Sequence, residues 1–248
     1  MKLTVLGCAG TFPGPDSPCS SYLVEHDGFR LVLDLGAGAV GQLQRHVGLL
    51  DLDAVYLSHL HADHCLDLVG YSYARQLDPD GAPPPLPVYG PAGTAARLCA
   101  AFDSPPRNGL RDVYDFREVP VGQQQIGPFT VTTARMNHPV ECHGLRVEAG
   151  GRSLVYSGDT GESEALVELA ADCDLLLCEA SWPDDPGRPA GVHLSGRQAG
   201  EHAERAGARR LLLTHLVAWT DPDVILGEAR GAYGGPAELA RCGQAYEL

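Results

Sequence analysis

Four side chains that bind divalent metal ions in many proteins stand within six residues of this sequence, at His59, His61, Asp63 and His64. Imidazole nitrogen and carboxylate oxygen are ligands of zinc and similar ions. His59 and His61 could point at one ion while Asp63 and His64 face a second. A polar surface loop rich in histidine is the alternative, but four ligands at this spacing favour a metal site.

The residues before this cluster predict how it is positioned. Residues 54–57 are short, apolar and rich in strand-forming side chains, which predicts a buried strand. A helix is predicted over 66–76, so the cluster is expected in a loop between a strand and a helix. Open α/β sheets bind ligands at the carboxyl ends of their strands, where this loop would lie.

Three more potential ligands stand just beyond apolar runs, namely His138, Asp159 and His215. Taken singly, each has a structural explanation, because an aspartate can cap a helix and a histidine can be half-buried and satisfied. Strands of one sheet can converge their ends on one site, so four such positions, His59 included, favour a common site.

The remaining elements alternate between strands and helices in both halves of the chain, which predicts two packed sheets with helices outside. Residues 78–87 hold five prolines and predict an irregular segment, and 103–109 predicts a second loop. Strands are predicted over 2–6, 21–25, 29–34, 54–57, around 88, 113–119, 129–136, 145–148, 153–156, 175–178 and 210–214, with two short strands in 237–248. Helices are predicted over 39–46, 66–76, 93–102, 162–171, 195–206 and 221–229.

Composition narrows the class of protein. The chain has 248 residues, enough for one large α/β domain or two small ones, and its net charge of −14 argues against a broad surface for nucleic-acid phosphates. The eight cysteines are scattered without a Cys-x-x-Cys pair, which fits reduced thiols in a cytoplasmic protein. Neither a membrane span nor a signal peptide is evident, so no membrane partner is expected.

The ligand pattern resembles the metallo-β-lactamase superfamily over nearly the whole chain. The resemblance implies a single domain over 1–248 with an αβ/βα sandwich fold and a two-metal site at one edge. By this resemblance His59, His61 and His138 hold one ion, Asp63, His64 and His215 hold the other, and Asp159 bridges them. The implied cofactors are two divalent ions, zinc first, with manganese or iron as alternatives.

Two further segments resemble the tRNase Z-like phosphodiesterases of that superfamily, namely 178–181, Cys-Glu-Ala-Ser, and 191–196, Gly-Val-His-Leu-Ser-Gly. The resemblance implies that His193 lies beside the scissile phosphate and that Glu179 supports it. A turn carboxylate and a loop histidine are the structural alternatives. His26, His46, His143 and His202 match nothing in the family; they are left as structural or solvent-facing.

The chain also differs from tRNase Z. Those enzymes carry a long tRNA-gripping arm between the motifs that His138 and Asp159 occupy here, where the chain has room only for a hairpin. The residues that follow His215 differ as well. The nearer resemblance is to compact bacterial cyclic-nucleotide phosphodiesterases, and it implies hydrolysis of a 3′,5′-cyclic nucleotide, cAMP first. An RNA-processing nuclease without the arm and a non-catalytic metal-binding domain are the alternatives.

The expected mechanism assigns a role to three residues. Two ions would activate a water and hold the phosphoryl oxygens. Asp63 would accept the proton of that water, and His193, supported by Glu179, would donate a proton to the leaving oxygen. The expected partner is a small anionic phosphodiester, and a homodimer is left open. Ser58, Ser157 and Thr214 flank ligands and are candidates for orienting them, although a plain strand-end hydroxyl is an equal alternative.

Overall fold

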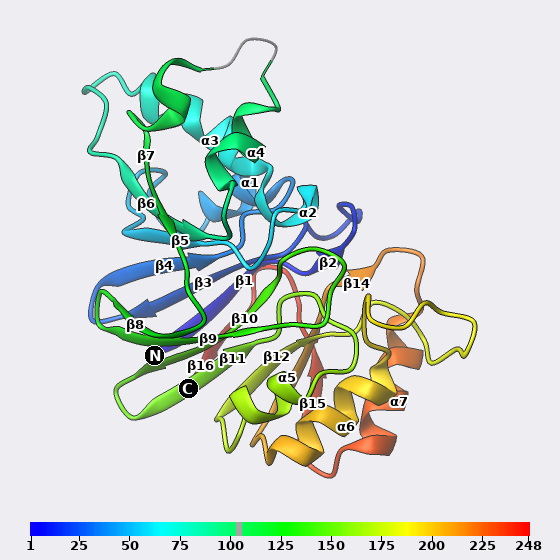
Figure 1. The fold of residues 1–248 in the computed structure, drawn as a ribbon. Coiled ribbons are helices and arrows are strands. Elements are labelled where there is room, and N and C mark those ends of the chain that lie inside the picture. Colours follow the sequence, from blue (N-terminus) through cyan, green and yellow to red (C-terminus); the bar gives the residue numbers. More distant parts are fainter. Residues whose placement is uncertain (103–105) are drawn as a thin grey trace.

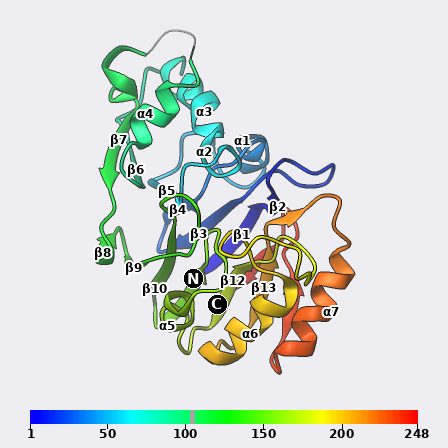
Figure 2. The same cartoon turned by 45° about the vertical axis from the view of Figure 1, so that its right-hand side comes forward.

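The computed structural model describes residues 1–102 and 106–248, and two packed β-sheets form its centre (Figures 1 and 2). Each sheet has seven strands within the described residues. The first sheet has the spatial order β16 (Ala245–Glu247), β1 (Lys2–Gly7), β3 (Ser21–His26), β4 (Phe29–Leu33), β5 (Ala54–Tyr56), β6 (Leu86–Gly90) and β7 (Tyr114–Glu118). The second has the order β15 (Ala237–Leu239), β13 (Leu211–Thr214), β12 (Leu175–Glu179), β11 (Arg152–Tyr156), β10 (His143–Ala149), β9 (Phe129–Arg135) and β8 (Gly122–Ile126).

Alternating side chains of each strand build three apolar layers. Leu31 and Leu33 of β4 face the core between the sheets, whereas Val32 faces the helices outside. In β12, Leu177 faces the same core and Leu176 the opposite side. This period of two follows from the pleat of a strand, and it requires helices on both outer faces.

Helices cover both outer faces, as the predicted αβ/βα sandwich requires (Figure 1). The helices against the first sheet are α1 (Ala39–Leu43), α3 (Asp67–Gln76) and α4 (Thr94–Cys99), with the short α2 (Ala62–Cys65) at the end of β5. The helices against the second sheet are α5 (Glu164–Leu169), α6 (Gly196–Ala206) and α7 (Pro222–Ala232). Among the described residues, none of the helices has the length and apolar character needed to span a bilayer.

The structure corrects several predicted elements. Strand β8 was missed because its Gln-Gln-Gln core gives no apolar alternation, and so were the two-residue strands β2 (Ala9–Gly10) and β14 (Leu216–Val217). Pro87, predicted as irregular, lies inside β6. Several predicted helices are too long, since α1 ends at Leu43 rather than at residue 46. Of the loop predicted over 103–109, residues 103–105 lie outside the described residues, and its end belongs to the 3₁₀-helix η1 (Arg107–Leu110).

Strand direction decides where the site lies. Strands β11, β12 and β13 run parallel, and β9 points the same way because two antiparallel pairings separate it from β11. Their carboxyl ends therefore share one edge of the second sheet. A hydrogen bond from the His143 amide to the Ser58 carbonyl, 3.0 Å long, joins this edge to the end of β5 in the first sheet.

Candidate metal centre

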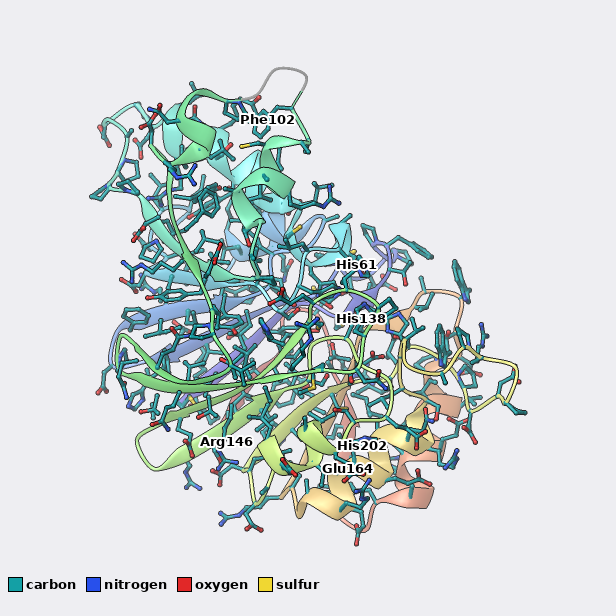
Figure 3. All side chains as sticks on the ribbon, in the orientation of Figure 1. His61, Phe102, His138, Arg146, Glu164 and His202 are labelled. Carbon is teal, nitrogen blue, oxygen red and sulfur yellow. The ribbon has the colours of Figure 1, made fainter. Side chains whose placement is uncertain are left out.

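Three overlapping groups of side chains at this edge could each hold a metal ion, and the smallest of them consists of Glu179, His193 and His215. In each group the ligand atoms lie within 4.8 Å of one another. Figure 3 places His61 and His138 close together at this edge. The outer cluster consists of His59, His61, His138 and Asp159, and the inner cluster of Asp63, His64, Asp159 and His215. All seven ligands expected from the sequence fall into these clusters, and Asp159 belongs to both.

The loop predicted to carry the first four ligands is partly helical. Asp63 and His64 lie in α2, a single turn, and their side chains reach the same cluster, with Asp63 Oδ2 3.5 Å from His64 Nε2. Gly36 of the loop after β4 packs on this turn, and a Cβ at this glycine would come within 2.0 Å of the Asp63 carbonyl oxygen. The Leu35 amide donates to the His64 carbonyl at 2.7 Å. The loop after β4 therefore fixes the position of α2.

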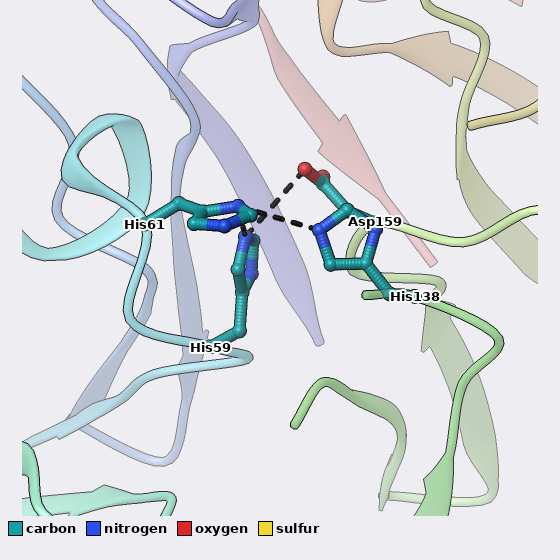
Figure 4. Close-up of side chains that lie close together, drawn as sticks. All are labelled: His59, His61, His138 and Asp159. Carbon is teal, nitrogen blue, oxygen red and sulfur yellow. Dashed lines mark hydrogen bonds and ion pairs between the residues drawn. The ribbon is translucent and has the colours of Figure 1, made fainter. Parts of the chain in front are cut away.

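In the outer cluster the imidazole nitrogens face one another (Figure 4). His61 Nδ1 lies 3.0 Å from His59 Nε2 and 3.3 Å from His138 Nε2. Asp159 Oδ2 is 3.6 Å from His59 Nε2. His61 is exposed and His138 is half-buried, so this cluster opens to solvent.

The inner cluster is more enclosed. His64 Nε2 lies 3.2 Å from His215 Nε2, and both rings are buried. Asp63 Oδ2 lies 3.1 Å from His215 Nε2 and accepts the Thr11 amide at 2.8 Å. Asp159 Oδ1 lies 3.3 Å from His64 Nε2. Only the Asp63 side chain, at 12% exposed, reaches solvent appreciably from this cluster.

Hydrogen bonds at the other ring nitrogens orient these histidines. His64 Nδ1 donates to Asp34 Oδ2 at 2.7 Å, and His138 Nδ1 donates to the Val192 carbonyl at 2.8 Å. Both acceptors require a proton on Nδ1, so in the neutral form of each ring the lone pair lies on Nε2, which faces the cluster.

The same logic applies to His59, whose Nδ1 lies 3.1 Å from Ser58 Oγ. The Ser58 hydroxyl donates its one hydrogen to Asp34 Oδ2 at 2.7 Å, so its oxygen accepts from His59. Ser58 therefore holds a metal-ligand candidate, as expected. Asp34, to which nothing in the sequence pointed, anchors both Ser58 and His64.

His215 is held through a second serine. Ser181 Oγ donates to Glu179 Oε2 at 2.8 Å and accepts from His215 Nδ1 at the same distance. The hydroxyls of the other two candidates, Ser157 and Thr214, make no hydrogen bond to a ligand side chain among the described residues. The Ser157 hydroxyl accepts from the Glu179 amide, and the Thr214 hydroxyl bonds to Tyr22 of the facing sheet.

The donor set fits a divalent cation. In both clusters ring nitrogens and carboxylate oxygens converge within 4.8 Å of one another, an arrangement that a bound cation would stabilise. Asp159 Oδ1 is buried and has no hydrogen bond among the described residues, although two ring nitrogens surround it. A buried unpaired carboxylate oxygen is costly, and a cation would satisfy it.

The electrostatic setting differs among the ligands. Burial lowers the pKa of His64, but the carboxylates of Asp159 and Asp34 outweigh it and raise that pKa well above its usual range, so a cation bound there would have to displace a proton. Burial lowers the pKa of His59 well below its usual range, which keeps this ring neutral. Burial raises the pKa of Asp159, but the nearby His215, His64 and His59 outweigh it and hold the pKa well below the usual value. Asp159 is therefore a carboxylate.

His193 lies against the clusters without belonging to the ligand sets proposed from the sequence. Its Nδ1 donates to Glu179 Oε1 at 2.9 Å and lies 3.9 Å from Asp159 Oδ2. Burial lowers the pKa of His193, yet the carboxylate of Glu179 and its hydrogen bond reverse this and raise the pKa to about 9. Glu179 is fully buried and also accepts the Thr160 and Leu194 amides.

The remaining histidines lie outside the two clusters. His202 of α6 accepts the Ser163 amide and donates to the Gln198 carbonyl, so it is a satisfied core residue. His46 is exposed. A cavity of about 300 Å³ adjoins His193, and Trp182 and Asn137 line its wall.

The αβ/βα sandwich with clustered histidine and aspartate at one sheet edge defines the class of protein. Residues 29–216 match the beta-lactamase superfamily domain, and the chain belongs to this superfamily. The uncharacterized protein ML1173 of Mycobacterium leprae is 44% identical over 260 residues, covering all of this chain and 89% of that protein.

Two other relatives have more informative names. The probable metallo-hydrolase YhfI of Bacillus subtilis is 32% identical, with full coverage of both chains. Its crystal structure matches this fold with a TM-score of 0.88, at 30% identity, over all of this chain and 98% of that one. A ribonuclease Z of Myxococcus xanthus is 31% identical over 304 residues, covering all of this chain and 98% of that enzyme.

Proposed function

We propose that this metal-dependent hydrolase cleaves 3′,5′-cyclic nucleotides, cAMP first, to nucleoside monophosphates. One arrangement carries the proposal. Two adjoining clusters share Asp159, and beside them lies His193, which is hydrogen-bonded to the buried carboxylate of Glu179. The superfamily membership and the relative named as a probable metallo-hydrolase support the reaction class. We further propose two divalent ions per chain, zinc first, one in each cluster.

The ions, when bound, would polarise the phosphoryl oxygens and make a water more acidic. Asp63 is suited to take the proton of the attacking water, because its carboxylate reaches solvent and the Thr11 amide fixes its orientation. His193 is protonated at neutral pH and lies on the accessible side of Asp159. It would donate a proton to the leaving ribose oxygen, a role for which Glu179 fixes the ring.

The segment between His138 and Asp159 favours a small substrate. It is occupied by the β10–β11 hairpin, whose strands pair from Leu145 with Tyr156 to Ala149 with Arg152, with no room for a substrate-gripping arm. The alignment with the Myxococcus ribonuclease Z runs over 304 positions, whereas this chain has 248 residues. The net charge of −14 is also unfavourable for a partner with many phosphates.

The relation to ribonuclease Z favours a second candidate function, an RNA-processing nuclease without the arm. Turnover of cAMP, cGMP and a precursor tRNA by the metal-replete protein separates the two. We expect efficient cAMP hydrolysis with weak salt dependence, because few phosphates are contacted. Efficient tRNA trimming with inert cAMP would establish the nuclease instead. His46→Ala, which changes an exposed histidine outside both clusters, is the matched control.

A further inference from the structure

An aromatic pair stands next to the metal centre, with Trp219 exposed and Phe12 half-buried. Trp219 is 75% exposed, and its ring centroid lies 4.8 Å from that of Phe12, with the ring planes tilted by 39°. Single exposed apolar residues are ordinary, but two contacting rings at the rim of a site are not.

The pair is built by the short strands β2 and β14, which lie side by side in both ribbon views (Figures 1 and 2). They are parallel, with Val217 opposite Gly10. Phe12 and Trp219 each stand two residues beyond that pair, so the register places the rings opposite each other. The pairing is close, because a Cβ at Gly10 would come within 2.4 Å of the His215 carbonyl oxygen.

Both aromatic residues are held by tight turns. The Phe12 amide donates to the Gly10 carbonyl at 2.7 Å, and the Thr220 amide donates to the Val217 carbonyl at 2.8 Å. Thr11 has a φ of +66°, a strained conformation for a β-branched residue. Such strain is found mostly at functional sites, where surrounding structure maintains it.

The same two segments also hold the inner cluster. Thr11, which precedes Phe12, donates its amide to Asp63 at 2.8 Å, and His215 directly precedes β14. The aromatic rings are therefore fixed relative to the site of phosphate chemistry. A ligand anchored by its phosphate at the clusters would bring an attached flat group toward them.

We propose that Phe12 and Trp219 form a stacking platform for the base of the substrate nucleotide. The inference rests on the proposed function and adds to it the residues that would bind the base of the nucleotide. Stacking on an aromatic face tolerates any base and grows with ring area. The platform therefore predicts a preference for purine over pyrimidine cyclic nucleotides, with little discrimination between adenine and guanine.

Fluorescence tests the platform without measuring turnover, because the chain has only two tryptophans. In Trp182→Phe, Trp219 is the one remaining reporter. In the metal-replete protein, excited at a wavelength where adenine does not absorb, we expect 5′-AMP to quench the emission of Trp219. Ribose 5-phosphate, which lacks a base, should leave this emission unchanged. In Trp219→Phe the reporter is Trp182, in the wall of the cavity beside His193. Quenching of Trp182 and not of Trp219 would move the base to that cavity and overturn the proposal.

Kinetics gives a second readout. Trp219→Ala should raise the KM for cAMP about 10- to 100-fold with little change in kcat, because stacking contributes to binding and not to the chemical step. Trp219→Tyr should restore most of the affinity. An unchanged KM in the double variant Phe12→Ala/Trp219→Ala would overturn the platform while cAMP hydrolysis stands. If the wild type does not cleave cAMP, the proposed function fails, and quenching by 5′-AMP still decides on the platform.

Measuring the molecular mass in solution tests the alternative that a second copy of the chain, and not a base, packs on Phe12 and Trp219. The platform predicts that wild type and Trp219→Ala have the same oligomeric state in solution. A dimer that dissociates on this substitution would identify the pair as a subunit contact and overturn the proposal.

Discussion

The outer and inner clusters share Asp159 but differ in what holds their histidines. In the inner cluster His64 donates to the buried carboxylate of Asp34, and His215 donates through Ser181 toward Glu179. In the outer cluster no histidine donates directly to a carboxylate among the described residues: His59 donates through Ser58 toward Asp34, His138 donates to a backbone carbonyl, and His61 is exposed. A carboxylate behind an imidazole raises its basicity and fixes its orientation. The comparison suggests that the inner cluster binds its metal more tightly.

Substituting Asp159, the ligand that both clusters share, should have the largest effect, because it should abolish metal binding at both clusters. Asp159→Asn removes the charge that both clusters use, so we expect loss of metal from both and activity near the background rate. Elemental analysis of metal-replete protein should find about two ions per wild-type chain and almost none in the variant. His61→Ala should keep the inner ion. One ion or none in a fully active wild type would contradict the two-metal site.

Removing His193 should separate chemistry from metal binding, since this residue is assigned to neither cluster as a ligand. His193→Ala should keep both ions and lose about 10²–10⁴-fold in cAMP turnover, the usual cost of losing a general acid. Bis(p-nitrophenyl) phosphate has a good leaving group and needs little protonation, so the variant should lose much less activity on it. Equal losses on both substrates, or release of metal, would assign the histidine a different role.

The carboxylate behind the inner cluster can be tested directly. Asp34 has a φ of +57°, a conformation that asparagine also tolerates, so Asp34→Asn changes charge with little backbone strain. We expect about a 10- to 100-fold loss of affinity at the inner site, where Asp34 contacts His64 directly, as is usual when a partner of a metal-ligating histidine is lost. The outer site, which Asp34 reaches only through Ser58, should lose less affinity. A chelator titration monitored by metal release measures it. A melting curve controls for stability, because Asp34 also accepts from Tyr156. Equal weakening of both sites would remove the proposed difference.

The smallest expected effect is a shift in the pH dependence of kcat. Glu179 raises the pKa of His193 to about 9, and the protonated ring is the active acid. Wild-type kcat on cAMP should therefore be maintained below this pKa and fall as the pH rises through it. Glu179→Gln removes the charge that raises the pKa, so the alkaline fall should move to lower pH. The pH profiles of the two proteins measure the shift, and identical alkaline limbs would show that this fall does not report His193.

Much of the fold follows from local patterns in the sequence. Apolar runs such as 175–178 form strands because one strand buries both faces, between the core and the outer helices. The predicted strands 21–25 and 29–34 pair as β3 and β4, joined by a tight turn after His26. Element ends were less predictable, since helices such as α1 stop where packing ends and not where helix-forming residues do.

The ligand types and their places at strand ends were determined by the sequence alone. Residues as close in sequence as His59 to His64 stay close in space however the other elements of the chain are arranged. Only the tertiary structure decided which atoms face each cluster and what stands behind them. Asp34 and Ser181 are single common residues far along the chain from the histidines that they hold. Their roles arise where loops of two sheets meet, a proximity that strand pairing and packing create and that no local pattern encodes.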